Sequence, residues 1–273
     1  MRRIDMIGRP LHHARSPGLL NPMFRARGDD VTVVTRELGP EDLPTYVSAM
    51  RRDPEAIGII VTTPLKQAIT GYLSERTGLV AFLGASNCVR FDLGAWIGAN
   101  FDGRGFLAAL AEVGGGAIAG KRILLVGCGG AGSAIAASLT EAAPIALNLH
   151  DIDRKRAANF AERLARFAPA STVEAVDRPS GRYDIIINAS TAGMNPGDPS
   201  PIEHETVAAA GIVADIVTVE DTALKRSARA LGKPVLTGGA MVTGQVGLLR
   251  RFLIGAARSE RDVLIEEGAT RRS

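Results

Sequence analysis

Short apolar runs alternate with longer amphipathic stretches from one end of the chain to the other. The apolar runs predict buried strands at residues 4–7, 31–34, 57–61, 123–126, 145–149, 185–187 and 212–213. The stretches between them predict helices at residues 16–26, 41–51, 105–113, 132–141, 154–167, 222–231 and 240–257. Because this alternation is typical of parallel sheets with helices on their faces, the sequence predicts an α/β fold.

The chain is long enough for two domains. Its 273 residues exceed the ~150 residues that one domain commonly holds. A glycine run at 114–116 follows a predicted helix, and a second boundary falls near 237–239. We expect a second domain at residues 103–239 and a first domain that joins residues 1–102 with 240–273. Within the latter, residues 259–273 are rich in Arg and Glu and predict a helix end that frays into solvent.

Composition narrows the classes of partner. The 32 basic and 29 acidic residues leave a net charge of +3, and aromatic residues make up 4% of the chain, so we expect no nucleic acid partner. No apolar stretch is long enough for a signal peptide or a membrane span. Cys88 and Cys128 have neither disulfide nor zinc spacing. We expect a cytoplasmic protein with no metal site, no membrane partner and at most a small anionic ligand.

A glycine-rich loop follows the predicted strand at 123–126. It matches G-x-G-x-x-G and comprises Gly127, Gly129, Gly130, Ala131 and Gly132, together with Cys128. In such loops the glycines permit a tight turn and close approach of the backbone to a pyrophosphate, which the N-terminus of the next helix then binds. The loop therefore predicts a dinucleotide site in the second domain. The alternative is a turn that merely packs tightly.

An acid follows the next predicted strand. Asp151 lies ~20 residues beyond the loop, where dinucleotide folds bind the adenosine ribose hydroxyls. Because a carboxylate there repels a 2′-phosphate, we expect NAD to be preferred over NADP. Arg154, Lys155 and Arg156 follow a turn later. In the alternative interpretation, Asp151 and Asp153 simply cap the helix that begins at Arg154.

Five short motifs have a specific order along the chain. They are Gly8-Arg9-Pro10 through His13-Ala14-Arg15-Ser16-Pro17, Val61-Thr62-Thr63-Pro64-Leu65-Lys66, Ala85-Ser86-Asn87-Cys88, Asn100-Phe101-Asp102-Gly103 and Met241-Val242-Thr243-Gly244-Gln245. As a set they resemble the shikimate dehydrogenase family over nearly the whole chain. The resemblance implies a Rossmann-type domain for NAD or NADP and a substrate domain that binds a polyhydroxylated ring acid.

The resemblance also implies that Lys66 and Asp102 are the catalytic pair. Oxidation of a secondary alcohol by hydride transfer requires a base within hydrogen-bond reach of the hydroxyl group. Lys66 can be that base, and Asp102 can orient it. The ordinary interpretations are a solvated lysine at a helix start and an aspartate that caps the helix predicted at 105–113.

Further contacts follow from the same resemblance. A ring acid needs several fixed hydrogen-bond partners, and those implied are Ser16, Thr62, Asn87 and Gln245. Ordinary alternatives are a helix cap for Ser16, a half-buried strand position for Thr62 and a turn for Asn87. The stretch at 188–194 resembles the family's N-A-T-x-x-G-M. The implied cofactor contacts outside the glycine loop are Asp151, Asn188, Ala189, Ile216, Gly238 and Met241.

The chain departs from the family pattern where hydroxyl groups are usual. Ala14 replaces a serine, Phe101 a threonine and Thr218 a tyrosine, while Ala99 replaces an acid. We expect a more apolar pocket floor beside Asp102 and weaker binding of shikimate, which leaves quinate or another cyclic hydroxy acid as alternative substrates. The alternative from another functional class is a non-catalytic ligand sensor with the same fold. For either function we expect a monomer or a homodimer.

Overall fold

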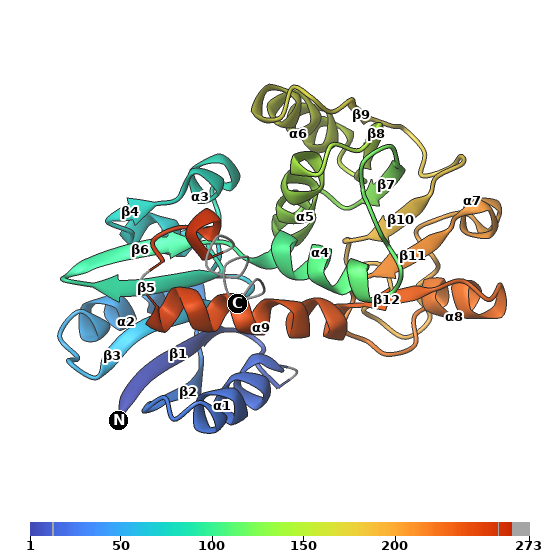
Figure 1. Ribbon diagram of the computed structural model, residues 1–273. Coiled ribbons are helices and arrows are strands. Elements are labelled where there is room, and N and C mark those ends of the chain that lie inside the picture. The colour runs from blue at the N-terminus through green and yellow to red at the C-terminus, as the bar shows by residue number, and fades with distance from the viewer. Residues whose placement is uncertain (13, 256, 264–273) are drawn as a thin grey trace, which may run out of the picture. The chain divides into compact units, whose positions relative to one another are not determined.

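The computed structural model describes residues 1–12, 14–255 and 257–263, so His13 lies outside the described residues. Contacts divide the chain into two compact units. Unit 1 contains residues 1–101 and the described residues from Gln245 onward, and unit 2 is Asp102–Gly244 (Figure 1). Both units are mixtures of helices and strands, which confirms the α/β class.

Unit 1 is built on a six-stranded sheet in the order β2-β1-β3-β5-β6-β4. Its strands are β1 (Arg2–Gly8), β2 (Val31–Glu37), β3 (Ala56–Val61), β4 (Glu75–Arg76), β5 (Cys88–Asp92) and β6 (Ala95–Ala99). β1 pairs in parallel with β2 and β3. β5 is antiparallel to both β3 and β6, so the expectation of purely parallel sheets is wrong here.

The β5–β6 hairpin has a local cause in the sequence. Leu93 and Gly94 form its turn with φ angles of 49° and 84°. Two consecutive positive φ angles match the right-handed twist of a two-residue hairpin, and Gly94 adopts such an angle without steric cost. Across the hairpin, Phe91 stacks on Trp96 with ring centroids 4.4 Å apart. The turn thus brings the start of β5 and the end of β6 to the same edge of the sheet.

Helices cover both faces of this sheet. They are α1 (Ser16–Ala26), η1 (Pro40–Asp42), α2 (Leu43–Met50), η2 (Ala68–Tyr72), α3 (Gly78–Leu83) and the later half of α9 (Gly238–Ile254). Ile4 packs in one core cluster with Leu20 and Phe252, whereas Ile7 packs in another with Val47. Because successive side chains of a strand point to opposite faces, the two clusters lie on opposite sides of the sheet. Each fully buried Leu, Ile or Phe contributes ~1.5–3 kcal/mol.

Unit 2 contains a six-stranded parallel sheet in the order β12-β11-β10-β7-β8-β9. Its strands are β7 (Arg122–Val126), β8 (Ala146–His150), β9 (Val173–Ala175), β10 (Ile185–Asn188), β11 (Ile212–Asp215) and β12 (Val235–Thr237). Its helices are α4 (Asp102–Glu112), α5 (Gly130–Glu141), α6 (Arg154–Phe167), α7 (His204–Ala209), α8 (Ala223–Ala230) and the first part of α9. This is the doubly wound dinucleotide-binding order, whose direction reverses between β7 and β10.

The end of the described chain is folded, contrary to expectation. A helical turn begins at Glu260, and both Glu260 and Val263 are buried, with 7% and 0% of their surface exposed. The prediction of a solvent-frayed end is therefore wrong for residues 259–263. The apolar contact of Val263 and the polar contacts of Glu260 outweigh the local charge pattern on which that prediction rested. Residues 264–273 lie outside the described part of the chain.

Candidate functional site

One edge of the unit 1 sheet collects the segments that the motifs singled out. The Thr62 amide, just after β3, donates to the Ile7 carbonyl at the end of β1 over 2.9 Å. The Asn87 amide donates to Ala99 at the end of β6 over 3.1 Å, and the Asn87 carbonyl accepts from the end of β3. The carboxyl ends of three strands and the amino end of β5 therefore meet at this edge.

The turn after β3 carries two of the predicted residues. Thr62 and Lys66 are both half-buried, and the Lys66 carbonyl accepts from the Ser86 amide over 2.8 Å. Leu65 between them has no exposed surface and anchors the turn in the core. Gly8 has a φ of 151°, and a Cβ atom there would lie 2.5 Å from the Thr62 side chain. A residue larger than glycine would therefore displace this turn.

Asn87 and Gln245 are joined directly in unit 1. The Asn87 side chain donates to Oε1 of Gln245 over 3.1 Å, although the two residues are 158 positions apart. Oδ1 of Asn87 accepts from the Phe101 amide over 2.9 Å. The exposed fractions are 4% for Asn87 and 7% for Gln245, so these bonds offset the cost of burying two amides. The structure thus brings together two predicted substrate contacts and the segment before Asp102.

Ser16 and Asp102 each open a helix. Ser16 is buried as the first residue of α1, whose N-cap is Arg15, so the alternative of Ser16 as a helix cap is wrong. Asp102 is 4% exposed and lies in the first turn of α4, where the helix dipole favours an acid. Since Lys66 belongs to unit 1 and Asp102 to unit 2, the pairing of these two side chains remains a prediction.

The departures from the family pattern differ in their surroundings. Phe101 has no exposed surface, and its ring packs edge-on against Phe252 with centroids 5.4 Å apart. The expectation of an apolar pocket floor at Phe101 is wrong, because the ring belongs to the core cluster of unit 1. Thr218 is exposed, and Ala14 is half-buried against the same cluster.

The glycine loop of unit 2 lies at the point where the strand order reverses. Gly127 has a φ of 99°, and a Cβ there would lie 2.5 Å from the Ser190 nitrogen. A Cβ on Gly132 would overlap the Gly127 carbonyl oxygen, so the third glycine allows α5 to pack on the loop. Gly129 and Gly130 are exposed and face open space at the start of this helix. The loop thus presents backbone N–H groups where an anion can approach closely.

A cavity of about 720 Å³ opens beside this loop. Gly127, Gly129, Asp151, Ile152 and Ala189 are among the residues that line it. Volumes of ~300–1,000 Å³ are usual for small-molecule and cofactor sites. The close-packed glycines, the open start of α5 and this cavity together fit a dinucleotide.

Asp151 ties the loop to the end of β8. Its Oδ2 accepts from the Cys128 amide over 2.8 Å, and its Oδ1 accepts from the Asp153 amide over 2.9 Å. Asp153, not Asp151, caps α6 by accepting from the Arg156 amide. The capping interpretation is therefore confirmed for Asp153 and wrong for Asp151. Burial and the nearby Asp151 charge raise the pKa of the Cys128 thiol to about 12.

Two of the three cations that follow Asp151 have acidic partners. The Arg156 guanidinium lies 3.4 Å from the Asp151 carboxylate and 3.5 Å from that of Asp153. Arg154 pairs with Asp177 at 3.4 Å. The apolar Ile152 is 96% exposed at the mouth of the cavity. Arg154 and Arg156 line the cavity as well, so this corner of the site holds a carboxylate, an apolar side chain and two guanidinium groups side by side.

The other predicted cofactor contacts cluster at the ends of β10, β11 and β12. The Ala189 amide donates to Val126 over 2.7 Å, and the Ile216 amide donates to Asn188 over 3.0 Å. A Cβ on Gly238 would overlap the Ile216 carbonyl oxygen. The fully buried Asn188 donates from its side chain to Asp215 and Ala192. Asn188 therefore shapes the loop itself, while Met241 is buried farther along, in α9.

Lys225 is a structural residue of this site that the motifs did not indicate. It is 1% exposed, and its Nζ donates to the carbonyls of Val217 and Val219 over 2.6 and 2.5 Å. These carbonyls flank Thr218, so Lys225 holds the loop that carries it. Burial lowers the pKa of Lys225, and the charge of Asp215 opposes this effect. A lysine on the apolar face of a predicted amphipathic helix was the signal that could have found it.

The described part of the chain lacks two further features. Across residues 1–12, 14–255 and 257–263, histidine, cysteine and carboxylate side chains do not gather in groups that could hold a metal ion. A membrane-spanning helix is absent from the same part of the chain.

Unit 2 defines the class: an α/β protein with a Rossmann-type dinucleotide-binding unit, joined to a second unit whose sheet has a polar edge. The family model for the shikimate dehydrogenase substrate binding domain matches residues 6–89. A shikimate dehydrogenase (NADP(+)) of Shouchella clausii is 30% identical over an alignment of 256 residues, and the match covers 90% of each chain. The chain therefore belongs to the shikimate dehydrogenase family, and it is an NAD(P)-dependent enzyme that acts on a CH–OH group.

Solved structures agree over nearly the full length. Shikimate 5-dehydrogenase from Thermus thermophilus, in complex with NADP(H) and shikimate, is 29% identical with a TM-score of 0.83, and 99% of each chain is covered. The 5-ketofructose reductase of Gluconobacter sp. strain CHM43 is 26% identical with a TM-score of 0.82, and 98% of each chain is covered. The same fold thus serves enzymes named for different substrates.

Proposed function

We propose that this enzyme reversibly oxidises shikimate to 3-dehydroshikimate and prefers NAD over NADP. The observation that supports the substrate is the polar edge of the unit 1 sheet, where Thr62, Lys66, Asn87 and Gln245 occur within one hydrogen-bonded set of strand ends. A ring acid with several hydroxyl groups needs this kind of fixed polar surface. Family membership favours an enzyme over the non-catalytic sensor.

In the proposed mechanism, Lys66 takes the proton of the substrate hydroxyl as the hydride leaves the same carbon. Asp102 orients the lysine and the hydroxyl group. Ser16, Thr62, Asn87 and Gln245 hold the carboxylate and the remaining hydroxyls of the ring. The glycine loop, Asn188, Ala189, Ile216, Gly238 and Met241 bind the dinucleotide. When bound, its nicotinamide accepts the hydride, which is chemistry that no side chain of the chain supplies.

The cofactor preference rests on the corner of unit 2 around Asp151. An adenosine 2′-phosphate would meet the carboxylate of Asp151, the apolar Ile152 and two arginines already paired with aspartates. Oδ2 of Asp151 accepts one bond from Cys128 and retains a lone pair for a ribose hydroxyl. Although the Shouchella relative is named for NADP(+), these charges favour NAD.

A second candidate keeps the chemistry and changes the acid. Ala14 and the exposed Thr218 lack the serine and tyrosine hydroxyls that the family pattern has at these positions. Quinate or another polyhydroxylated ring acid that needs fewer hydroxyl partners fits such a site. The fold similarity to a reductase named for a keto sugar supports a variable substrate within this architecture.

The decisive experiment is a set of initial rates with shikimate and quinate, each with NAD and NADP. We expect the highest kcat/KM for shikimate with NAD. A higher value for quinate would favour the second candidate, and a higher value with NADP would overturn the cofactor preference. Turnover of neither acid with either dinucleotide would overturn the proposed function.

A further inference from the structure

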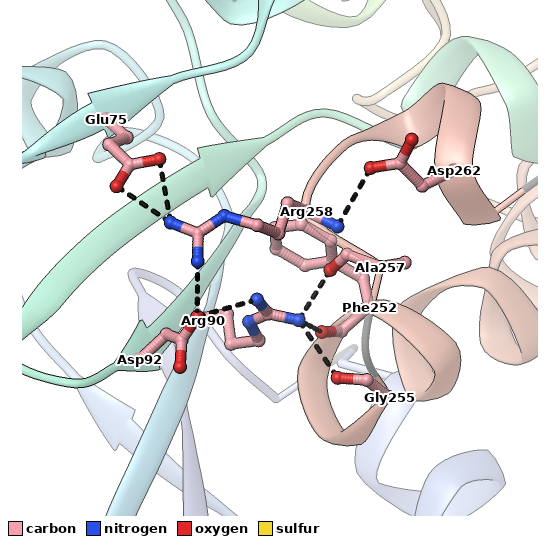
Figure 2. A network of polar contacts seen from close by, with 8 residues as sticks. All are labelled: Glu75, Arg90, Asp92, Phe252, Gly255, Ala257, Arg258 and Asp262. Atoms are coloured by element: carbon pink, nitrogen blue, oxygen red, sulfur yellow. Dashed lines mark hydrogen bonds and ion pairs between the residues drawn. The ribbon is translucent and has the colours of Figure 1, made fainter.

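The segment that follows α9 is fastened to unit 1 by two arginines. The Arg258 guanidinium forms two hydrogen bonds with Glu75 on β4, at 2.8 and 3.0 Å, and one with Asp92 at 2.8 Å (Figure 2). Arg90 on β5 donates to the Gly255 and Ala257 carbonyls over 2.9 and 2.5 Å. These contacts hold residues 257–263, which we call the C-terminal clasp, against the sheet.

The clasp is ordered within itself as well. The Arg258 amide donates to the Asp262 carboxylate over 3.0 Å (Figure 2). The Asp262 amide donates to the Ser259 hydroxyl over 3.2 Å. These two bonds satisfy the amides of Arg258 and Asp262 at the start of the helical turn. Val263 is fully buried in the core cluster that contains Phe101. The clasp therefore has a defined conformation, and this conformation can fix the position of one of its side chains.

That side chain is Glu260. It is 7% exposed, and its Oε1 accepts from the Thr77 hydroxyl over 2.8 Å and from the Asn100 amide over 2.7 Å. Thr77 is the N-cap of α3. The Asn100 side chain also has no exposed surface and donates to the Ala85 carbonyl. A carboxylate is buried in this way only where it gains strong charge-assisted hydrogen bonds.

Asn100 and Phe101 form the link between β6 and Asp102, and both of their amides are held by side chains. Glu260 holds the first amide, and Asn87, which also binds Gln245, holds the second. We propose that Glu260 is a positioning residue for the dehydrogenase reaction: through the Asn100 amide it sets the path of the chain into Asp102. This inference rests on the proposed roles of Asp102, Asn87 and Gln245.

The proposal explains why a buried carboxylate lies against the polar groups at the end of β6. Anchoring alone would be served by Val263 and by the arginine contacts of the clasp. Glu260 instead directs its charge at a backbone N–H that β6 no longer pairs, because that strand ends at Ala99. Without this acceptor, the link before Asp102 would lose one of the two side chains that hold its amides. Shifts of about 1 Å at a catalytic group cost ~100-fold in rate.

The test uses the full-length enzyme with Glu260→Ala and Glu260→Gln. Both of these bonds go to Oε1, so the glutamine oxygen can still accept them, whereas alanine removes the acceptor. We expect Glu260→Ala to lower kcat with shikimate 10- to 100-fold, with a smaller change in KM for shikimate and none in KM for NAD. Glu260→Gln should retain kcat within about threefold.

A second readout does not require turnover. Hydrogen exchange of peptides that span residues 97–102 should accelerate at least tenfold in Glu260→Ala, while peptides from β7 in unit 2 stay unchanged. Val47→Ala is the matched control, because Val47 is buried on α2 in the other core cluster and its truncation lowers stability without touching this network.

Three outcomes would overturn the proposal. They are unchanged exchange at residues 97–102 in Glu260→Ala, an unchanged kcat in that variant, or an equal kinetic loss in Val47→Ala. Failure of the proposed function is distinguishable, because it would appear as an inactive wild-type enzyme. In that case the exchange measurement alone decides whether Glu260 holds the Asn100 amide.

Discussion

The two units build their candidate sites from different materials. At the edge of unit 1, side chains bond to one another and to the backbone, as with Asn87, Gln245 and Glu260. At the strand-order reversal of unit 2, glycines bring backbone close to backbone, and the Gly127 and Gly132 positions leave no room for a side chain. A ring acid differs from its relatives in a few hydroxyls, whereas every dinucleotide presents the same pyrophosphate. Side chains therefore suit the first task and backbone groups the second.

This difference predicts how each site fails. A substitution in unit 1 removes one partner from a hydrogen-bonded set and leaves the others, so the effect appears in rates and selectivity. A substitution in the glycine loop changes the space between two backbone segments, so the effect appears in stability and dinucleotide affinity together. The following experiments test that distinction.

The largest expected effect is that of Lys66→Ala. Removal of the proton acceptor should lower kcat ~100- to 10,000-fold, since a positioned general base contributes that much. Dinucleotide affinity, measured by calorimetry, should stay within about twofold. Lys121→Ala, which removes a half-exposed lysine of unit 2, is the control and should leave kcat unchanged. A Lys66→Ala enzyme that keeps more than about a tenth of the wild-type kcat would contradict the assigned role.

The next effect compares two glycines of one loop. Gly132→Ala places a Cβ against the Gly127 carbonyl and should cost ~1–3 kcal/mol of stability, together with a more than tenfold loss of dinucleotide affinity. A Cβ atom on Gly129 would face open space when no dinucleotide is bound. The Tm of Gly129→Ala should therefore stay unchanged, while its dinucleotide affinity still falls. Thermal unfolding and calorimetry measure both. Equal Tm values for the two variants would show that α5 can move away from the loop.

Ile152→Arg should change cofactor selectivity about tenfold. Ile152 is almost fully exposed, so its replacement by arginine removes no core contacts. Because Asp151 already pairs with Arg156, the new guanidinium can bind the 2′-phosphate of NADP. The ratio of kcat/KM for NAD to that for NADP should fall, while the KM for shikimate stays constant. Ile152→Gln, of similar length without charge, is the control. If both variants shift the ratio equally, side-chain length and not charge determines selectivity.

A smaller effect concerns the bond between Asn87 and Gln245. A double-mutant cycle with Asn87→Ala and Gln245→Ala should show a coupling of ~1 kcal/mol in kcat/KM for shikimate, because the two amides touch. Asn87→Ala should also lower stability, since it leaves the Phe101 amide without this acceptor. Additive effects on kcat/KM would mean that the two side chains act on the substrate independently.

The last comparison leaves the sequence unchanged and concerns the chemical reactivity of one thiol from each unit. At pH 8 the raised pKa of Cys128, about 12, should slow alkylation ~1,000-fold relative to a free thiol, and the rate should rise about tenfold per pH unit. Cys88 has no exposed surface, and burial raises its pKa as well. NAD should slow the reaction of Cys128 further by holding the glycine loop, and it should not affect Cys88. Mass spectrometry of the labelled peptides distinguishes the two sites, and equal protection of both would contradict the loop assignment.

Some elements of this protein could be predicted from interactions between residues close together in the sequence. The predicted helices at 16–26 and 154–167 coincide with α1 and α6, and the glycine loop runs from the end of β7 into the first turn of α5. In these segments the apolar spacing, the glycines and the capping Asp153 all act within a few residues. The β5–β6 hairpin had a local signal too, in Leu93-Gly94, but its strands are short and follow no simple alternation.

The sequence by itself determined the α/β class, the dinucleotide loop and the family to which the chain belongs, because each depends on residues adjacent in the chain. Only the tertiary structure decided that Asn87 binds Gln245, that Phe101 packs into the core, and that Glu260 reaches the Asn100 amide. These contacts join residues far apart in the chain, and burial gives each its strength by removing the competing water. No local pattern records which distant partner a buried amide or carboxylate will find.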